Sequence, residues 1–388
     1  MRPLVARIDR GLIAGAITAS LPEGGAPIRL GGRSPGPEAV IILKSWRALW
    51  RLTIDGSVGW YEGWAAGEWE SPDPVALIEV FSRNRHSLAS KGRAHGISRL
   101  LRRIWHRAHR NDRAGARRNI HEHYDLGNEF YQLWLDPSMT YSSAIFAAPG
   151  EPLEDAQRRK LQAILDRTAT RPGDRILEIG CGWGPFAETA AKAGIGVHGI
   201  TLSTEQKAYA EQRMARGGLS GVEIELIDYR DVTGSYDGVA SIEMVEAVGE
   251  EFWPDYLGAI ARALKPGGRA AIQYIAIDDA MYEGYARNVD FIQRYVFPGG
   301  MLLSETRFRA IAEKAGLRWI DRHAFGLDYA ETLKRWRATF DEVVAAGLLP
   351  IRFDKHFIDL WRFYLMYCEG GFRGGGIDVA QVTLVKGE

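Results

Sequence analysis

Three glycines stand at alternate positions of the sequence, Gly180, Gly182 and Gly184. They follow a short apolar run that contains one acid, Glu178. The run predicts a buried strand, and residues 186–193 after the glycines predict a helix. Glycine lets the backbone approach a ligand, with amide N–H groups facing it at the start of the helix. The spacing indicates a nucleotide-binding turn, although such turns also occur only to close a tight connection.

The elements around this turn alternate regularly between strand and helix. Strands are expected at 175–179, 196–202, 222–227, 236–242 and 269–275, and helices at 152–169, 186–193, 204–216 and before a turn at 265–268. Ser203 is the expected cap of the helix at 204–216. This order predicts a Rossmann-like, doubly wound α/β sheet that binds ligands at the carboxyl ends of its strands.

The residues at two of these strand ends distinguish between cofactors. A dinucleotide site has the spacing Gly-x-Gly-x-x-Gly and an acid after the second strand. Here the spacing is Gly-x-Gly-x-Gly, and the second strand ends in Thr201-Leu202. NAD and a dehydrogenase activity are therefore disfavoured. The shorter spacing is used by S-adenosylmethionine methyltransferases, for which Asp228 offers an acceptor to adenine and Gln206 offers hydrogen bonds to ribose.

Eight ordered motifs make the resemblance more specific. They are Glu178 to Gly184, Gly199 to Gln206, Asp228 to Asp231, His123 to Asn128, Met139 to Ala144, Glu246 to Gly249, Tyr295 to Gly300 and Phe325 to Tyr329. Together they resemble the cyclopropane-fatty-acyl-phospholipid synthases and the related mycolic acid cyclopropane synthases. The likeness covers residues 119–388 and is looser before them.

The resemblance implies that S-adenosyl-L-methionine is the cofactor and that ten residues bind it. These are Tyr141, Ser142, Gly180, Gly182, Thr201, Leu202, Gln206, Asp228, Tyr229 and Ile242.

The reaction that the resemblance implies is methylation of a double bond in an unsaturated phospholipid acyl chain. An alkene is a weak nucleophile, so the site must hold the sulfonium in line, tolerate a carbocation and exclude water. A base then removes a proton, and in this family that base is a bicarbonate bound by Cys, Glu, His, an Ile backbone and Tyr. The Glu, Ile and Tyr positions fall on Glu246, Ile275 and Tyr329. Ser143 and Gln273 occupy the Cys and His positions, and Gln273 cannot shuttle a proton.

The product depends on which proton the cation loses. Loss from the transferred methyl group gives a cyclopropane fatty acid. Loss from a neighbouring chain carbon gives a methyl-branched unsaturated chain, as in relatives that feed furan or branched fatty acid pathways. A third hypothesis, motivated by Ser143 and Gln273, is a lipid-binding relative that has lost activity.

Composition sets broader limits on domains and partners. With 388 residues the chain is long enough for two domains, and its 49 basic and 49 acidic residues give no global field that would attract nucleic acid. Residues 1–90, with strands at 39–43 and 51–54 and a helix at 74–81, predict an N-terminal α+β accessory domain. Residues 91–118 form a basic linker, and 119–388 form the catalytic domain, with a lipid-binding cap at about 278–370.

A membrane contact is expected to be peripheral. The basic linker would attract anionic headgroups, at about 1 kcal/mol per charge near the surface, but it is equally explained as a solvated linker. No apolar run reaches the roughly 18 to 20 residues that a membrane span needs. Two separated cysteines, Cys181 and Cys368, favour a reducing cytoplasmic setting. We predict no metal site, and a homodimer is left open.

Overall fold

The computed structural model describes residues 2–89 and 126–388. The chain forms two compact units, one of residues 1–108, 280–298 and 333–377 and one of residues 109–279, 299–332 and 378–388. Much of the segment that we expected to form a cap therefore belongs to the same unit as the N-terminal residues. The basic linker 91–118 and residues 123–125 of one family motif lie outside the described residues, so the expectations about them stay predictions.

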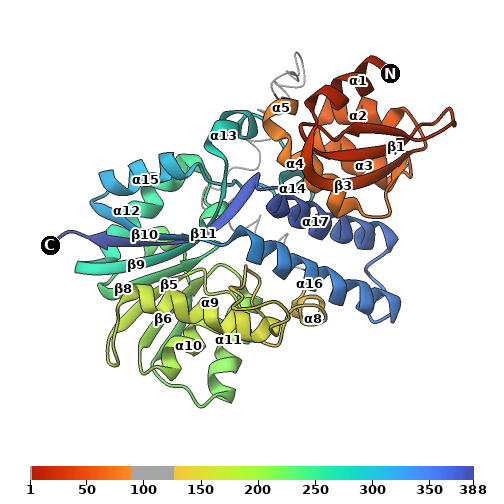
Figure 1. Ribbon diagram of the computed structural model, residues 1–388. Helices are drawn as coiled ribbons and strands as arrows, with labels where there is room; N and C mark the ends of the chain where they lie inside the picture. Colours follow the sequence, from red (N-terminus) through yellow and green to blue (C-terminus); the bar gives the residue numbers. More distant parts are fainter. Residues whose placement is uncertain (1, 90–125) are drawn as a thin grey trace. The chain divides into compact units, whose positions relative to one another are not determined.

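A seven-stranded sheet organises the unit that contains the glycine turn (Figure 1). Its strands are β5 (Arg175–Ile179), β6 (Gly196–Thr201), β7 (Val222–Leu226), β8 (Tyr236–Ile242), β9 (Leu264–Ile277), β10 (Leu317–Ala324) and β11 (Ile377–Lys386), in the order β10-β11-β9-β8-β5-β6-β7. Neighbours from β9 to β7 pair in parallel, and β10 pairs with β11 antiparallel. The predicted Rossmann-like α/β sheet is confirmed. Because β5 and β8 are parallel neighbours, Gly180 and Glu243 follow them at the same edge of the sheet.

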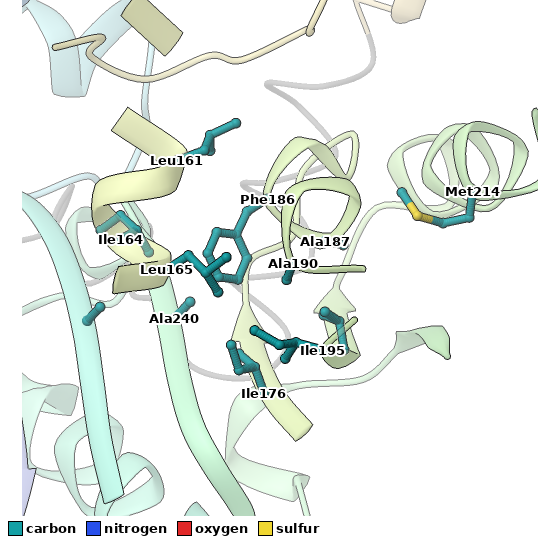
Figure 2. Packing of buried hydrophobic residues seen from close by; sticks show 12 residues of the cluster. Leu161, Ile164, Leu165, Ile176, Phe186, Ala187, Ala190, Ile195, Met214 and Ala240 are labelled. Carbon is teal, nitrogen blue, oxygen red and sulfur yellow. The ribbon is translucent and has the colours of Figure 1, made fainter. Parts of the chain in front are cut away.

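The helices of this unit are α8 (Asn128–Gln132), α9 (Leu153–Thr168), α10 (Pro185–Lys192), α11 (Thr204–Arg216), α12 (Trp253–Ala263), α15 (Glu305–Lys314) and the first turns of α16 (Gly326–Ala345), with short 3-10 turns η1 (Tyr229–Asp231), η2 (Val245–Ala247) and η3 (Glu250–Phe252). Ser203 caps α11 as predicted, because its hydroxyl accepts the Gln206 N–H at 3.2 Å. In Figure 2 apolar side chains of α9, α10 and β8 pack together around Phe186, which is fully buried. This core fixes the strands whose ends carry the site.

Two local predictions about secondary structure were wrong. Residues 51–54 were expected to be a strand, but they lie in helix α2 (Arg47–Asp55). Their β-branched side chains were outweighed by a helical pattern that buries Ala48 and Leu49 and ends at Gly56, where φ is 59°. Residues 265–268 were expected to be a turn before the last parallel strand, but β9 begins at Leu264 and includes them. The pairing with β8 shifts register there, which accommodates the Pro-Gly-Gly sequence.

The other unit contains a four-stranded sheet of order β2-β1-β3-β4. Its strands are β1 (Ala14–Ser20), β2 (Ile28–Gly31), β3 (Ser34–Leu43) and β4 (Trp69–Glu70), and its helices are α1 (Arg2–Gly11), α2, α3 (Ser57–Ala65), α4 (Pro74–Arg83), α5 (Arg85–Ala89), α13 (Asp279–Ala286), α14 (Phe291–Tyr295) and α17 (Lys355–Arg373). Asp73 caps α4 by accepting the Ala76 N–H at 3.1 Å. The predicted strand at 39–43 and helix at 74–81 are both present.

Aromatic side chains from α3, α14 and α17 form the core of this unit. The Tyr61 ring lies 4.8 Å from that of Phe291 and 5.2 Å from that of Phe363. Phe291 and Phe363 are fully buried. The three rings thus pack against one another in the interior of this unit. Among the helices at residues 2–89 and 126–388, none has both the length and the hydropathy to cross a bilayer.

Candidate functional site

The glycine turn depends on backbone conformations that side chains disfavour. Gly180, Gly182 and Gly184 have φ values of 82°, 52° and 82°. A Cβ atom on Gly180 would lie 2.8 Å from Cγ of Met244, whereas one on Gly182 would meet nothing within 4 Å. The Gly180 N–H donates to the Ile200 carbonyl at 3.0 Å, which ties the turn to β6. The turn therefore has open space on the side where a ligand would approach.

A cavity of about 180 Å³ opens beside this turn. Nine of the ten residues expected to bind the cofactor line it: Tyr141, Ser142, Gly180, Gly182, Thr201, Leu202, Gln206, Tyr229 and Ile242. The Thr201 hydroxyl donates to Gln206 Oε1 at 2.9 Å, so the Gln206 amide is held at the wall with its nitrogen still able to donate. Glu178 Oε2 is buried at the same wall and has no hydrogen-bond partner among the described residues. A turn with space for a ligand and a buried carboxyl oxygen able to form a hydrogen bond fit the polar part of a nucleoside cofactor.

Asp228 is the expected cofactor residue that does not line the cavity. Its carboxylate accepts two hydrogen bonds from the Arg230 guanidinium, both at 2.8 Å, and one from the Arg230 backbone N–H at 2.9 Å. An adenine amino group would have to share an acceptor that Arg230 already holds. The role of Asp228 towards adenine stays a prediction.

Lys160 is a buried charge at this cavity that sequence reasoning missed. It is fully buried on α9, and its Nζ donates to the Ser142 hydroxyl. Burial lowers the pKa of Lys160 to about 8, while Glu243 is the largest influence raising it. Burial raises the pKa of Glu178 to about 8, which Lys160 opposes. The helical spacing of the sequence contained a signal for this buried lysine. Lys160 lies four residues from both Ala156 and Ile164, so it belongs to the apolar face of the amphipathic helix α9.

Three of the expected catalytic residues converge on a residue that the sequence analysis did not select, Glu243. The Ser143 N–H donates to Glu243 Oε1 at 2.9 Å, the Gln273 amide donates to the same oxygen at 2.7 Å, and the Tyr329 hydroxyl donates to Oε2 at 2.7 Å. The Ser143 hydroxyl instead donates to the Ala144 carbonyl at 3.0 Å. Ser143 thus acts on Glu243 through its backbone, so the exchange of Cys for Ser leaves this contact unchanged.

Glu246 and Ile275 form a second contact close by. The Ile275 N–H donates to Glu246 Oε1, and the buried Oε2 has no hydrogen-bond partner among the described residues. Burial and, after it, the charge of Glu243 together raise the pKa of Glu246 from 4.5 to about 8. Glu246 is accordingly protonated at neutral pH.

Glu243 itself occupies a strained backbone position. Its φ is 49°, in the left-handed region that non-glycine residues seldom adopt, at a cost of about 1 kcal/mol or more. Its N–H donates to the Gln273 carbonyl at 2.8 Å, which holds the backbone in place. The residue directly follows the predicted strand 236–242, so the rule that ligands bind at strand ends was the available signal.

Gln381, on β11, orients Gln273. Its amide donates to Gln273 Oε1 at 3.1 Å, so that the amide nitrogen of Gln273 faces Glu243. The same amide lies 3.4 Å from the Lys160 carbonyl. We name Ser143, Glu243, Glu246, Gln273 and Tyr329 the carboxylate cluster. Because Glu243 also lines the cavity beside the glycine turn, the cluster and the cofactor cavity share a wall.

Comparison with known proteins identifies relatives of the whole chain. Residues 111–382 match a family model described as mycolic acid cyclopropane synthetase. A tuberculostearic acid methyltransferase of Mycobacterium tuberculosis is 37% identical, with 99% of this chain and 95% of that protein covered. A cyclopropane-fatty-acyl-phospholipid synthase of Escherichia coli strain K12 is 33% identical, with 93% and 91% covered.

Solved structures show the same likeness over 70% of the chain. The cyclopropane synthase MmaA2 of Mycobacterium tuberculosis has a TM-score of 0.66 and 28% identity, covering 70% of this chain and 98% of that one. The mycolic acid cyclopropane synthase CmaA1 in complex with S-adenosylhomocysteine (SAH) and CTAB has a TM-score of 0.65 and 29% identity, with 70% and 98% covered.

Proposed function

We propose that this chain, which belongs to the mycolic acid cyclopropane synthetase family, transfers a methyl group from S-adenosyl-L-methionine to the double bond of an unsaturated phospholipid acyl chain. The cofactor and the class of enzyme follow from the family. The observation that carries the choice of an alkene as acceptor is the shared wall: a partly buried carboxylate, Glu243, lines the cofactor cavity. Methylation of an alkene needs a proton acceptor at that place.

The residues around the cavity have separable tasks. When bound, the cofactor supplies an electrophilic methyl group on a positively charged sulfur. Gly180, Gly182 and Gln206 would hold the nucleoside part, and the apolar side chain of Ile242 at the cavity wall would help to keep water from a cationic substrate. The Tyr141 ring lines the cavity and is held by contacts of 5.4 Å to Tyr131 and 5.6 Å to Trp134. An aromatic face so fixed stabilises positive charge.

The product that we propose is a cyclopropane fatty acid. A relative named as a cyclopropane synthase matches over nearly the whole chain and supports it. A relative named as a methyltransferase matches over 99% of the chain and favours the alternative, a methyl-branched chain. Both products arise from one cation by loss of different protons, so the first step of the proposal is common to them.

Because the proposed substrate is a membrane lipid, we propose that the enzyme works at a membrane surface, on the cytoplasmic face. Helix α2 exposes Trp50 and Ile54, at 58% and 54%, one turn apart, with the exposed Arg47 one turn before Trp50. An aromatic and an aliphatic side chain beside a cation suit the interface of an anionic bilayer. A homodimer and the basic linker as a further membrane contact stay proposals.

The test is incubation of the enzyme with cofactor carrying a deuterated methyl group and vesicles of unsaturated phosphatidylglycerol. Mass spectrometry of the lipids should show one added deuterated carbon, and vesicles of saturated lipid should gain none. Upfield cyclopropane signals in the proton NMR spectrum would establish ring closure, whereas a retained olefin with a new methyl branch would establish the alternative. Absence of label from the lipid would refute the proposed acceptor and leave the hypothesis of an inactive lipid-binding relative.

A further inference from the structure

The family implies a bound bicarbonate, and the donors that would hold it are already engaged. Of the five expected positions, the backbone of Ser143, the amide of Gln273 and the hydroxyl of Tyr329 all donate to Glu243. The Ile275 N–H donates to Glu246. A separate anion would have to displace the Glu243 carboxylate from all three of its donors. The residues of this chain therefore do not fit bicarbonate.

We propose that the carboxylate of Glu243 takes the place of bicarbonate and is itself the base that accepts the proton lost after methyl transfer. The inference rests on the proposed function for its substrate. It replaces a diffusible anion by a residue of the chain, so that this enzyme would need no added bicarbonate.

The hydrogen bonds leave Glu243 one place for a proton. An ionised carboxylate offers about four lone-pair sites. Ser143 and Gln273 fill two sites on Oε1, and Tyr329 fills one on Oε2. Oε2 retains the fourth lone-pair site, and Glu243 lines the cavity beside the glycine turn. The geometry thus both positions the carboxylate and keeps one acceptor position available.

The charges around Glu243 favour its ionised form over that of its neighbour. Burial raises the pKa of Glu243 above its usual value, and Lys160, the Tyr329 hydroxyl and the Ser143 and Gln273 donors oppose that rise. Glu246 has no such set of donors and stays protonated at neutral pH. When two neighbouring acids have different environments, the one with more hydrogen-bond donors is the better proton acceptor and the other stays neutral. Here Glu243 is the proton acceptor and Glu246 is the neutral group. Lys160 on α9, Tyr329 on α16 and Glu246 on η2 are the titratable groups that act on Glu243 most directly.

The backbone supports a functional reason for Glu243. Glu243 has a φ of 49°, a backbone conformation that glycine adopts without cost. Glycine at this position would therefore relieve backbone strain, and the glutamate side chain is present in spite of that strain. Strain of this kind persists where the surrounding structure fixes it, as the bond from the Glu243 N–H to Gln273 does here.

The proposed step balances in atoms and charge. The alkene π pair forms a bond to the methyl carbon, the sulfur–carbon bond breaks with its electron pair on sulfur, and a neighbouring chain carbon becomes positive. A C–H bond then breaks, either in the transferred methyl group or on the chain carbon next to the cation, and its proton goes to Glu243 Oε2. Its electron pair closes the ring in the first case and forms a new double bond in the second. Glu243 returns its proton to solvent before the next turnover.

The test compares the full-length enzyme with Glu243→Gly and Glu243→Gln in buffer freed of carbon dioxide, with and without added bicarbonate. Glycine suits the local backbone and leaves a hole of carboxylate size, whereas glutamine keeps the hole filled with a neutral group. We expect the wild-type rate to change less than twofold with bicarbonate. Both variants should lose about 10²- to 10⁴-fold in turnover, and bicarbonate should restore at least tenfold to Glu243→Gly alone.

Binding measurements separate this proposal from the proposed function. Relaxation of ¹³C-labelled bicarbonate should reveal binding to Glu243→Gly and not to the wild-type protein, whether or not any lipid is methylated. Ala169→Gly is a matched control, because Ala169 also has a positive φ, 54°, but is exposed at the end of α9. Bicarbonate binding by the wild-type protein, a tenfold activation of it, or a Glu243→Gln variant with more than a third of wild-type turnover would each overturn the proposal. Failure of the wild type to label any lipid, with the binding pattern as expected, would instead count against the proposed function.

Discussion

The glycine turn and the carboxylate cluster share a cavity wall but are built differently. The turn uses the backbone: three glycines with positive φ and amide groups tied to a neighbouring strand. The cluster gathers side chains of β9 and α16, and a backbone N–H of the loop before α9, around the side chain of Glu243, which directly follows β8. The backbone of the glycine turn shapes the space that a ligand occupies, whereas the side chains of the carboxylate cluster determine the protonation state of Glu243. Changes in the first should therefore alter cofactor binding, and changes in the second should alter turnover and its pH dependence.

The largest expected effect is on the turn. Gly180→Val would place a side chain 2.8 Å from Met244 Cγ at a φ of 82°, so we expect affinity for S-adenosyl-L-methionine to fall more than about 100-fold, measured by titration calorimetry. Gly173→Val is the matched control, because its φ is 95° and its Cβ would meet nothing within 4 Å. If both variants bound the cofactor equally well, the turn would not be the cofactor cradle.

The next effect is on the cluster and separates rate from binding. Tyr329→Phe removes the donor to Glu243 Oε2 while keeping the ring, so turnover should fall about tenfold with cofactor affinity unchanged. Because the Tyr329 hydrogen bond lowers the pKa of Glu243, its loss should move the acidic limb of the rate profile to higher pH. A fall in rate without that displacement would mean that Tyr329 acts elsewhere.

Glu246→Gln should affect turnover less than threefold, because glutamine imitates a protonated glutamate. Its clearer consequence is for stability. Below pH 4.5 the Glu246 carboxyl is protonated in both states, whereas between pH 4.5 and about 8 it loses its proton only on unfolding. The wild type should lose up to about 1.4 kcal/mol of unfolding free energy per pH unit over that range, a share that the variant lacks. Denaturant unfolding at pH 5 and pH 8 measures the difference, and parallel pH dependences would show that Glu246 is ionised in the folded protein.

The smallest effect is expected from the residue that orients Gln273. Gln381→Leu removes the donor to Gln273 Oε1, so the Gln273 amide can rotate and its bond to Glu243 becomes weaker. We expect about a threefold loss of turnover and a small rise in the pH at which the rate reaches half its maximum. An unchanged profile would show that Gln273 needs no orientation.

The sequence predicted the backbone-built site far better than the side-chain-built one. Glycines at alternate positions, Ser203 before a helix and alternating apolar runs are local signals, and the corresponding elements were found at nearly their expected bounds. The strand at 51–54 failed because four residues carry too little pattern to outweigh a helix that begins at Arg47. The seven-stranded sheet order, with β11 beside β9, depends on long-range pairing that no local pattern specifies.

Glu243 was missed for a physical reason. Its importance comes from donors that are distant in sequence, and its left-handed backbone cannot be inferred from a glutamate. Ser143 and Gln273 stand out in the sequence instead, because they depart from the family pattern. Their side chains differ from the expected ones, but a backbone N–H and an amide nitrogen still converge on one point, and that point is a carboxylate.

The position of Gln381 has a consequence for the order in which the parts of the site form during synthesis of the chain. It contacts a helix residue, Lys160, that precedes it by 221 positions, and it lies on the last strand of the sheet. At about 5–20 residues per second, roughly 10 to 45 s of synthesis separate the two. During that interval the nascent chain can complete the glycine turn and could hold its cofactor, but its proton acceptor is not yet fully positioned. Competence to bind the methyl donor would thus precede competence to use it.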